Sequence, residues 1–193
     1  MTHGNRNNIQ YLYRMIHHYT LDSTLKYGIL SHNEANKRGL INPIYDISNP
    51  DVQNRRHQIH DYVCLYFSPR NPMLYFHRNR QQDIIFLGVD FDIISEHGAG
   101  FTDGNAASYD TQFYWDIAQL NQLKWEILNA PFWGNYPDGK RIKCAEVLIP
   151  HKIDVQKIIK IFCYTEIQKE SCKKIIFSNN IELCVEVDRS LYF

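Results

Sequence analysis

The chain has no net charge, no long apolar run and no paired cysteine motif, and each absence removes a class of protein. The 21 basic and 21 acidic residues cancel, so no overall basic field attracts nucleic acid, although a local patch would suffice. No apolar run approaches the roughly 18 residues of a membrane span. The polar start MTHGNRNN also lacks the apolar region of a signal peptide. We therefore expect a cytoplasmic protein without a membrane segment.

The cysteines show no CxxC spacing, which argues against a structural zinc site. They lie mostly in apolar runs and are typical of reduced packing residues in a cytosolic protein. The five are Cys64, Cys144, Cys163, Cys172 and Cys184. We predict that the protein needs no metal.

What is present is the composition of an ordinary globular protein. The 193 residues are 44% hydrophobic and 22% charged, enough for one sizeable core but not for a second full domain. Repeats and low-complexity tracts are absent, so we expect a single domain over residues 1–193. Aromatic residues make up 13% of the chain, with 13 tyrosines, which favours rings available for stacking as well as for the core.

The most informative segment is HDYVCLYFSPRNPMLY, residues 60–75. Its apolar and aromatic part, 62–67, is typical of a strand buried on both faces. Pro69 and Pro72 fix two φ angles and should hold Arg70 and Asn71 in a stiff loop instead of a helix. Two interpretations remain open: a core strand with a hairpin-like turn, or a site that carries an exposed arginine within a local basic cluster.

The other elements alternate between strand-like and helix-like patterns. A first strand is expected at 9–16, and Asp22 or Ser23 can cap a short helix that runs to Gly28. Further strands are expected at 83–89, 144–149 and 184–187, with an extended end at 191–193 and a strand or helix-to-strand transition at 155–164. Helices are expected at 91–96 and 167–174, and irregular helical pieces at 113–128. Loops are expected at 33–56, 98–107 and 131–140. This mixed order predicts an α+β fold with a strongly bent central sheet.

Glu146 is the sharpest single candidate for a functional group. It lies in the strand-like run CAEVLIP, and burying an ionised carboxylate without a partner is costly. Its side chain must therefore face solvent or line a cleft where a ligand or an arginine satisfies it. Taken individually, the other candidates have ordinary explanations. His17 is typical of a structural histidine at a strand end. The Arg55–Arg56 doublet is typical of solvated charges, and the stretch 103–105 is typical of a turn.

Several segments taken together resemble the DarT family, the DNA ADP-ribosyltransferase toxins of DarTG toxin–antitoxin systems. They are YLYRMIHHYTLDSTLKYGIL, the NRR before the central segment, HDYVCLYFSPRNPMLYF, FTDGNAASYDTQFYWD, KCAEVLIP and VEVDRSLYF. Their order and spacing match the family over nearly the whole chain. The central segment and TDGNAA are the specific parts, whereas AEVLIP alone would be weak.

The resemblance implies an ADP-ribosyltransferase fold with a split, bent central β-sheet, peripheral helices and a cleft for NAD. It assigns catalysis to Glu146 and to Arg56, which we favour over its neighbour Arg55. It assigns NAD binding to His17, Thr20, Gly28, Leu30, Arg55, Arg56 and Tyr66. It assigns nucleic-acid binding to Arg70, Asn71, Met73, Tyr75, Asn105 and Arg141.

The implied reaction is a glycosyl transfer in which NAD is the co-substrate and nicotinamide leaves. A carboxylate at Glu146 would hold the ribose 2′-hydroxyl and stabilise the oxocarbenium-like transition state. The expected acceptor is a base in single-stranded DNA, thymidine in preference to guanosine, and the expected partner is a DarG-like macrodomain antitoxin. We expect a monomer. The alternatives are a related transferase that acts on RNA or protein, and an inactive nucleic-acid-binding module with the same fold.

Overall fold

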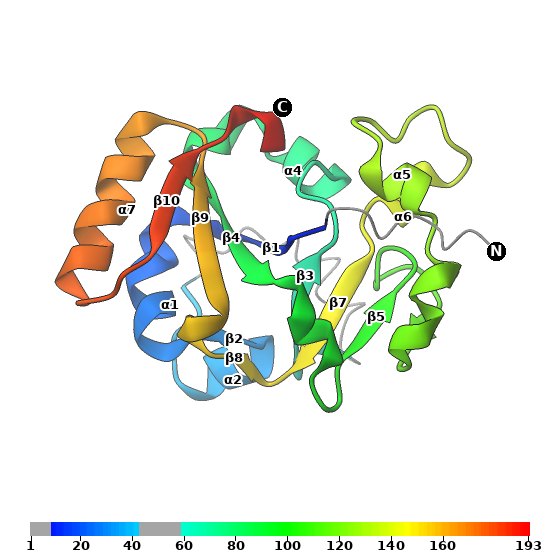
Figure 1. The fold of residues 1–193 in the computed structure, drawn as a ribbon, viewed down its shortest axis with the longest axis horizontal. Coiled ribbons are helices and arrows are strands. Elements are labelled where there is room, and N and C mark those ends of the chain that lie inside the picture. The colour runs from blue at the N-terminus through cyan, green and yellow to red at the C-terminus, as the bar shows by residue number, and fades with distance from the viewer. Residues whose placement is uncertain (1–8, 43–58) are drawn as a thin grey trace.

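The computed structural model describes residues 9–42 and 59–193, and its centre is an eight-stranded sheet, most of whose strands are labelled in Figure 1. The strand order is β10-β9-β4-β1-β3-β7-β5-β6. These strands are β1 (Tyr11–His17), β3 (Tyr62–Tyr66), β4 (Ile84–Asp90), β5 (Gly100–Thr102), β6 (Phe113–Tyr114), β7 (Glu146–Pro150), β9 (Ile158–Cys163) and β10 (Cys184–Val187). Nearly all neighbours run antiparallel, but β9 and β10 are parallel, so the sheet is mixed.

The sheet consists of two well-paired halves joined at one place. Strand β1 pairs with β4 along its whole length, and β3 pairs with β7 along its whole length. Between β1 and β3, the central neighbours, the register contains the single pair Tyr13–Tyr66. Beyond that pair the two strands diverge, which confirms the expected split of the sheet.

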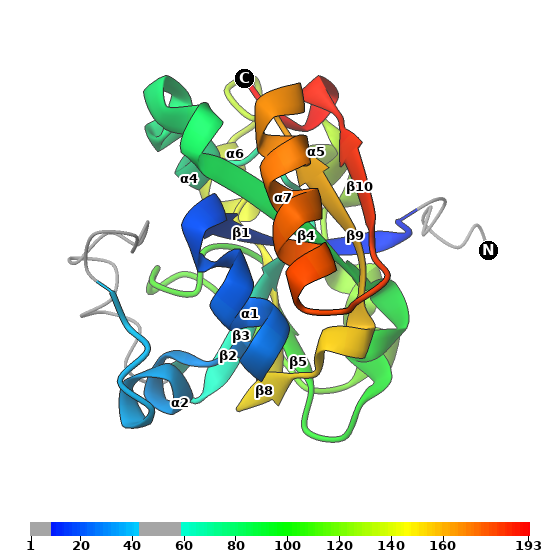
Figure 2. The same ribbon diagram turned by 90° about the vertical axis from the view of Figure 1, so that its left-hand side faces the viewer.

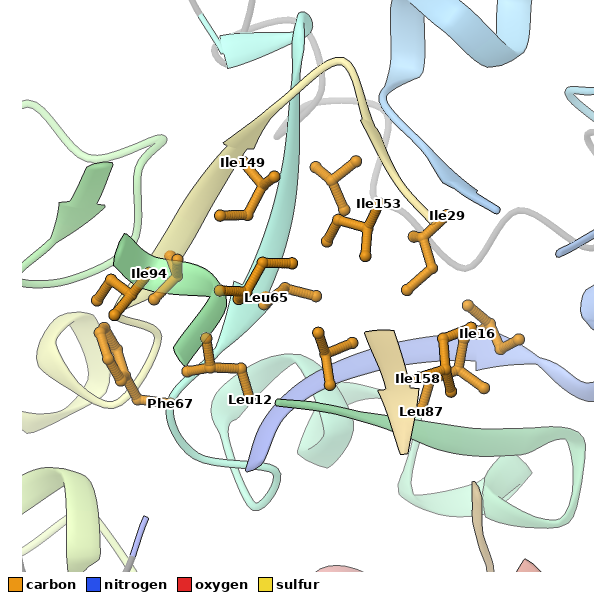
Figure 3. Packing of buried hydrophobic residues seen from close by; sticks show 14 of the residues in the cluster. Leu12, Ile16, Ile29, Leu65, Phe67, Leu87, Ile94, Ile149, Ile153 and Ile158 are labelled. Atoms are coloured by element: carbon orange, nitrogen blue, oxygen red, sulfur yellow. The ribbon is translucent and has the colours of Figure 1, made fainter. Parts of the chain in front are cut away.

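The main hydrophobic core lies between the two halves. Figure 3 shows Leu65 and Ile149 on one side facing Leu12, Ile16 and Leu87 on the other. Strand β4 is buried along almost its entire length, as expected for the continuous apolar run IIFLGV. Each of these large aliphatic side chains contributes roughly 1.5–3 kcal/mol through burial, so the core holds the halves together where the ladder does not.

Helices cover the edges of the sheet, and α7 (Glu166–Ser178) lies across the β9–β10 side (Figure 2). A capping box formed by Thr165 and Gln168 begins this helix. The other α-helices are α1 (Leu21–Tyr27), α2 (His32–Lys37), α4 (Pro72–Phe76), α5 (Trp125–Asn129) and α6 (Gly139–Ile142). The 3₁₀ helices are η1 (His18–Thr20), η3 (Arg78–Asp83), η4 (Phe91–Ser95), η5 (Ile117–Gln122), η6 (Val155–Lys157) and η7 (Arg189–Leu191).

A small second sheet pairs β2 (Ile29–Leu30) with β8 (Lys152–Ile153). Within the described ranges, no helix has the length and apolar character needed to cross a membrane.

Two local expectations are wrong, one about the residue that caps α1 and one about the turn after β3. Asp22 and Ser23 lie inside α1, because the 3₁₀ turn η1 leads directly into that helix and Thr20 occupies the cap position. The hairpin-like turn after β3 is absent. Pro72 instead occupies the first turn of α4, where its missing N–H costs nothing.

Regular structure also appears in two stretches that were expected to be loops. Helix α2 (His32–Lys37) covers the start of the stretch 33–56, and the Ser31 side chain caps it by accepting a hydrogen bond from the Glu34 amide at 3.2 Å. Strand β5 lies within 98–107 and pairs with β7. The end of the chain is extended only in part, because η7 includes residue 191. The polar and glycine-rich composition of these stretches did not indicate the short elements, because caps and pairing partners distant in sequence stabilise them.

Candidate active site at the split of the sheet

A cavity of about 250 Å³ opens where β1 and β3 diverge. Its wall is built from the end of β1, helices α1 and α2, strand β2, the segment around β3 and the first residue of β7. It is lined by seven of the residues expected at the site, namely His17, Thr20, Gly28, Leu30, Tyr66, Met73 and Glu146. Arg55 and Arg56 lie outside the described residues. The fold thus brings every other residue expected to bind NAD to one cavity.

Glu146 is buried on the cavity wall, with 2% of its surface exposed. Its position is fixed through its backbone: it pairs with Tyr66 across the β3–β7 ladder, and its amide donates to Thr102 Oγ1 at 3.0 Å. The Thr102 hydroxyl donates in turn to the Gly104 carbonyl at 2.7 Å. The interpretation of Glu146 as a solvent-facing residue is therefore wrong, and the carboxylate belongs to the cleft.

His17 ends β1 and is also buried, with 5% of its surface exposed. Burial, followed by the neighbouring charge of His18, lowers its pKa below the usual value near 6.5. The imidazole is therefore neutral at pH 7. Its Nδ1 accepts a hydrogen bond from the Tyr19 amide at 3.3 Å, so the proton of the neutral ring is on Nε2. A neutral ring of this tautomer carries a single N–H donor.

Thr20 and Gly28 shape the cavity rather than supply charge. The Thr20 hydroxyl donates to the His17 carbonyl at 2.8 Å and thereby fixes the turn after β1. Gly28 ends α1 at φ +83°, and a Cβ placed there would lie 2.4 Å from the Ile153 carbonyl oxygen. The backbone of β8 thus lies directly against this glycine. Leu30, two residues later, pairs with β8 and lines the cavity.

Arg14 lines the same cavity and was missed by the sequence reasoning. Its Nη1 donates to the Cys64 carbonyl at 3.1 Å, across the gap where β1 and β3 separate. Its Nε is buried and has no hydrogen-bond partner among the described residues. The available signal was a charged residue inside the strand YLYRMIH, which is as unusual as Glu146 in its own strand.

Asn71 was expected to contact a DNA base, and its environment argues against that role. The residue is fully buried. Its side-chain oxygen accepts from the Leu74 amide at 3.0 Å, and its side-chain nitrogen donates to the Ser68 carbonyl at 3.0 Å. Asn71 is therefore the N-cap of α4, and it positions neighbours that face the cavity, such as Met73.

Replacing Asn71 with alanine is expected to destabilise the protein by about 1–2 kcal/mol, because it removes a helix cap and leaves a buried carbonyl without its donor. Urea unfolding followed by circular dichroism measures this loss. Asn79→Ala, at an exposed position a few residues further on, should change the free energy of unfolding by less than about 0.5 kcal/mol. Equal effects of the two substitutions would contradict the assignment of Asn71 as the cap.

Arg70 is half-buried, which corrects the expectation of an exposed arginine. Its guanidinium carbon lies 4.7 Å from the centre of the Phe193 ring. Tyr75 is more accessible, with 42% of its surface exposed. Of the residues in the central segment expected to bind DNA, Arg70, Met73 and Tyr75 thus keep accessible or cavity-facing groups.

Arg141 and Asn105, also expected to bind DNA, are used inside the TDGNAA loop. Arg141 forms ion pairs with Asp103 and Asp138, each at 2.7 Å, and donates to Thr111 Oγ1 at 3.1 Å. The Asn105 side chain accepts from the Ala107 amide at 2.9 Å. Both residues organise the loop, and a DNA contact through either one would compete with these bonds.

Three potential metal ligands lie together at the end of β1. Suitable atoms of His17, His18 and Asp83 are within 4.8 Å of one another. His18 Nδ1 is 3.2 Å from the Asp83 carbonyl, and Arg80 Nε donates to the Asp83 carboxylate at 3.2 Å. Because these groups already have protein partners, the absence of a metal requirement stays our prediction.

Comparison with known proteins agrees with this geometry. A family model described as "ssDNA thymidine ADP-ribosyltransferase, DarT" matches residues 13–193. A DNA ADP-ribosyl transferase of Thermus sp. (strain 2.9) is 27% identical over 185 residues, covering 86% of each chain. A DNA ADP-ribosyl transferase–DNA ADP-ribosyl glycohydrolase fusion protein of Thermosipho africanus is 30% identical over 183 residues. This match covers 88% of the present chain but only 46% of that longer relative.

Solved structures show the same fold. Thermus sp. 2.9 DarT in complex with ADP-ribosylated ssDNA superposes with a TM-score of 0.86 at 25% identity, covering 95% of this chain and 96% of that one. The carba-NAD⁺ complex of the same protein gives a TM-score of 0.81 at 25% identity, covering 95% and 98%. The predicted α+β fold with its split sheet is confirmed. The chain belongs to the DarT family of single-stranded DNA thymidine ADP-ribosyltransferases.

Proposed function

We propose that this chain transfers ADP-ribose from NAD to a thymidine base of single-stranded DNA and releases nicotinamide. The observation that carries the proposal is the meeting of Glu146 and His17 on one cavity at the split of the sheet. These residues come from strands far apart in sequence, and both polar side chains are buried. Burying a carboxylate and an imidazole costs free energy, so a ligand that uses them is the physical reason to keep them.

His17 is proposed to position NAD and Glu146 to drive the bond cleavage. The neutral His17 ring offers its Nε2 proton to an acceptor on the substrate. As the bond between nicotinamide and ribose breaks, positive charge develops on the ribose, and the carboxylate stabilises that state more than the ground state. Nicotinamide leaves as a neutral molecule, because NAD carries the positive charge on that ring before cleavage.

The second half of the reaction forms a bond from the ribose anomeric carbon to a nitrogen of the base. That nitrogen loses its proton as the new bond forms, so a nearby base must accept the proton. We propose that the Glu146 carboxylate accepts the proton, and that the arginine implied by the family resemblance, Arg56 in preference to Arg55, helps its removal by stabilising the negative charge that develops on the base. Arg14, on the same wall, adds a fixed positive charge that favours an anionic substrate.

We further propose a macrodomain antitoxin of the DarG type as the partner of this chain. In the Thermosipho africanus relative, a DNA ADP-ribosyl glycohydrolase is fused to the transferase. A glycohydrolase would reverse the modification, which is the chemistry that an antitoxin for this reaction needs. The chain itself is proposed to act in the cytoplasm as a single-domain monomer, which sedimentation equilibrium would check.

The function is tested by incubating the protein with NAD and matched acceptors. Single-stranded DNA that contains thymidine should gain the mass of one ADP-ribosyl group, with release of one nicotinamide. The same oligonucleotide with every thymidine replaced by another base, an RNA of the same sequence, and a mixture of unfolded proteins should gain none. Modification of the RNA, of the proteins or of guanosine instead would overturn the proposed substrate.

The low pKa of His17 predicts how stability depends on pH. The folded state binds a proton at His17 less readily than the unfolded state, so the contribution to stability is present above pH 6.5 and is lost as the pH falls below it. The free energy of unfolding should therefore decline between pH 7.5 and 5 in the wild type, by at most about 1.4 kcal/mol per pH unit from this group. His17→Asn should decline less in parallel urea titrations. Equal declines would contradict the prediction.

A further inference from the structure

Arg14 is a charged residue on the core-facing side of β1. Leu12 and Ile16, two positions before and after it, are buried in the main hydrophobic core and face the other half of the sheet (Figure 3). Successive side chains of a strand alternate between its faces, and β1 pairs with β4 without a bulge, so Arg14 projects from the same face. An apolar residue would be expected at such a position. The Arg14 side chain nevertheless reaches the cavity at the split and lines it.

The guanidinium of Arg14 takes the place of a missing backbone bond between β1 and β3. The two strands share the single pair Tyr13–Tyr66. If their antiparallel register continued, Met15 would lie opposite Cys64 and the strands would stay roughly 4.8 Å apart. The strands instead separate there, and Arg14 Nη1 donates to the Cys64 carbonyl at 3.1 Å. A side chain thus bridges the opening that a ladder of backbone bonds would have closed.

Keeping this half-buried arginine costs the fold free energy. Its Nε is buried without a hydrogen-bond partner among the described residues. No carboxylate of the described ranges forms an ion pair with it. A guanidinium in such a place is normally less favourable than an apolar side chain of similar length. The bond from Arg14 to Cys64 is therefore explained by what it positions, and not by a net gain in stability.

The Arg14 bond connects the strand that carries His17 to the ladder that carries Glu146. His17 follows Arg14 by three positions on β1, which β4 pairs along its whole length. Cys64 lies on β3, where Tyr66, two residues later, pairs with Glu146 of β7. Each half is stiff because its ladder is continuous, so a change in the distance between Arg14 and Cys64 moves Glu146 relative to His17. Core packing joins the halves behind the gap, whereas Arg14 joins them at the cavity itself.

We propose that Arg14 is a positioning residue for the transfer reaction. Its bond to Cys64 keeps the split open at a fixed width, and so holds the Glu146 carboxylate in a fixed position relative to a substrate bound at His17. This inference rests on the proposed function. Displacing a reacting group by about 1 Å can lower a rate by about 100-fold although every group is still present. Loss of Arg14 should therefore slow the chemical step more than it weakens the binding of NAD.

Arg14→Met removes the bond and keeps the approximate length of the side chain. The single-turnover rate of ADP-ribosyl transfer, at saturating NAD and DNA, should fall by about 10- to 100-fold. The temperature of unfolding should stay within about 4 °C of the wild type, because removal of a partly buried charge offsets the lost hydrogen bond. Arg189→Met, which removes an exposed arginine from η7, should change neither value. A wild-type rate in Arg14→Met would overturn the inference.

Arg14→Lys distinguishes a single bond to a carbonyl from a direct contact with an anion. Lysine keeps the charge, and one N–H of its ammonium group suffices for one carbonyl. It does not reproduce the planar fork that binds a phosphate through two bonds. The lysine variant should therefore retain at least about a third of the wild-type rate. A lysine variant as slow as Arg14→Met, or a loss confined to KM for NAD, would mean that Arg14 binds the pyrophosphate itself, and would overturn the inference.

A double-mutant cycle shows whether Arg14 acts through Glu146. If Arg14 serves to place the carboxylate, its loss matters little once the carboxylate has been removed. In the Glu146→Gln background, Arg14→Met should therefore lower the residual single-turnover rate by less than about threefold. A general disturbance of the fold would lower the rate by the same factor in both backgrounds. Equal factors would thus contradict the positioning role.

Crystal structures of the wild type and of Arg14→Met measure the placement without any activity. The distance between the Glu146 carboxylate and the His17 ring should change by about 1 Å in the variant. An unchanged distance would overturn the inference, even if the rate falls. If the wild type modifies no DNA, the proposed function fails, and a displaced carboxylate in the variant would still support the positioning role of Arg14.

Discussion

Replacing Glu146 with glutamine is expected to lower the rate of ADP-ribosyl transfer by at least about 100-fold. Glutamine keeps the shape and can still accept a hydrogen bond, but it lacks the negative charge that stabilises the developing cation. The backbone contacts of residue 146 to Thr102 and Tyr66 do not involve the carboxylate, so the fold and the cavity should survive. The loss should therefore fall on kcat, with little change in the affinity for NAD.

Single-turnover transfer to a thymidine-containing oligonucleotide measures the effect of Glu146→Gln, and isothermal titration measures NAD binding. Glu126→Gln, at an exposed position on α5, is the matched control because it removes the same charge elsewhere on the surface. A variant that retained a tenth or more of the wild-type rate would show that Glu146 is not the catalytic carboxylate. Lost NAD binding with normal kcat would give it a binding role only.

Gly28→Ala is expected to destabilise the protein by about 3 kcal/mol, the largest stability effect that we predict. At φ +83° and ψ −178° the backbone is in a region that is essentially restricted to glycine. The added methyl group would also lie 2.4 Å from the Ile153 carbonyl oxygen, and backbone cannot move as a flexible side chain can. Relief of this clash requires β2 and β8 to separate, which would widen the cavity wall next to Leu30.

Gly39→Ala separates the two contributions to this cost. Gly39 also has a positive φ, +65°, but a Cβ there would meet nothing within 4 Å. It should therefore cost only about 1 kcal/mol, the conformational part. Urea unfolding of both variants gives the difference, about 2 kcal/mol, as the effect of close approach to β8. If the two variants were equally stable, contact with Ile153 would play no part in the requirement for glycine.

Continuous apolar runs predicted the central strands well, because a strand that is buried on both faces consists mostly of apolar residues. Strand β4 and most of β3 and β7 lie where these runs predicted. The failures were short elements whose stability comes from one cap or one distant partner. Helix α4 depends on the Asn71 side chain and on Pro72 at its first position, and strand β5 depends on pairing with β7.

The site could be predicted only in part from residue patterns. Glu146 stood out as a carboxylate in an apolar run, but its orientation depends on which face of β7 meets the cleft. His17 and Glu146 were associated by the family resemblance, and both line one cavity. Arg14 was missed although a charged residue inside the strand YLYRMIH was a local signal, because the gap that it spans follows from the divergence of β1 and β3 and cannot be seen in the sequence. The roles of Arg55 and Arg56 stay predictions.

The single pair Tyr13–Tyr66 also has a mechanical meaning. Two half-sheets that share one residue pair transmit little strain through the ladder between them, so the side chains of the core packed between the halves set their relative position. His17 belongs to one half and Glu146 to the other, and both line the cavity. The separation of these two side chains therefore depends on the packing of core residues that never touch a substrate, and a substitution in that core can change activity without altering the site itself.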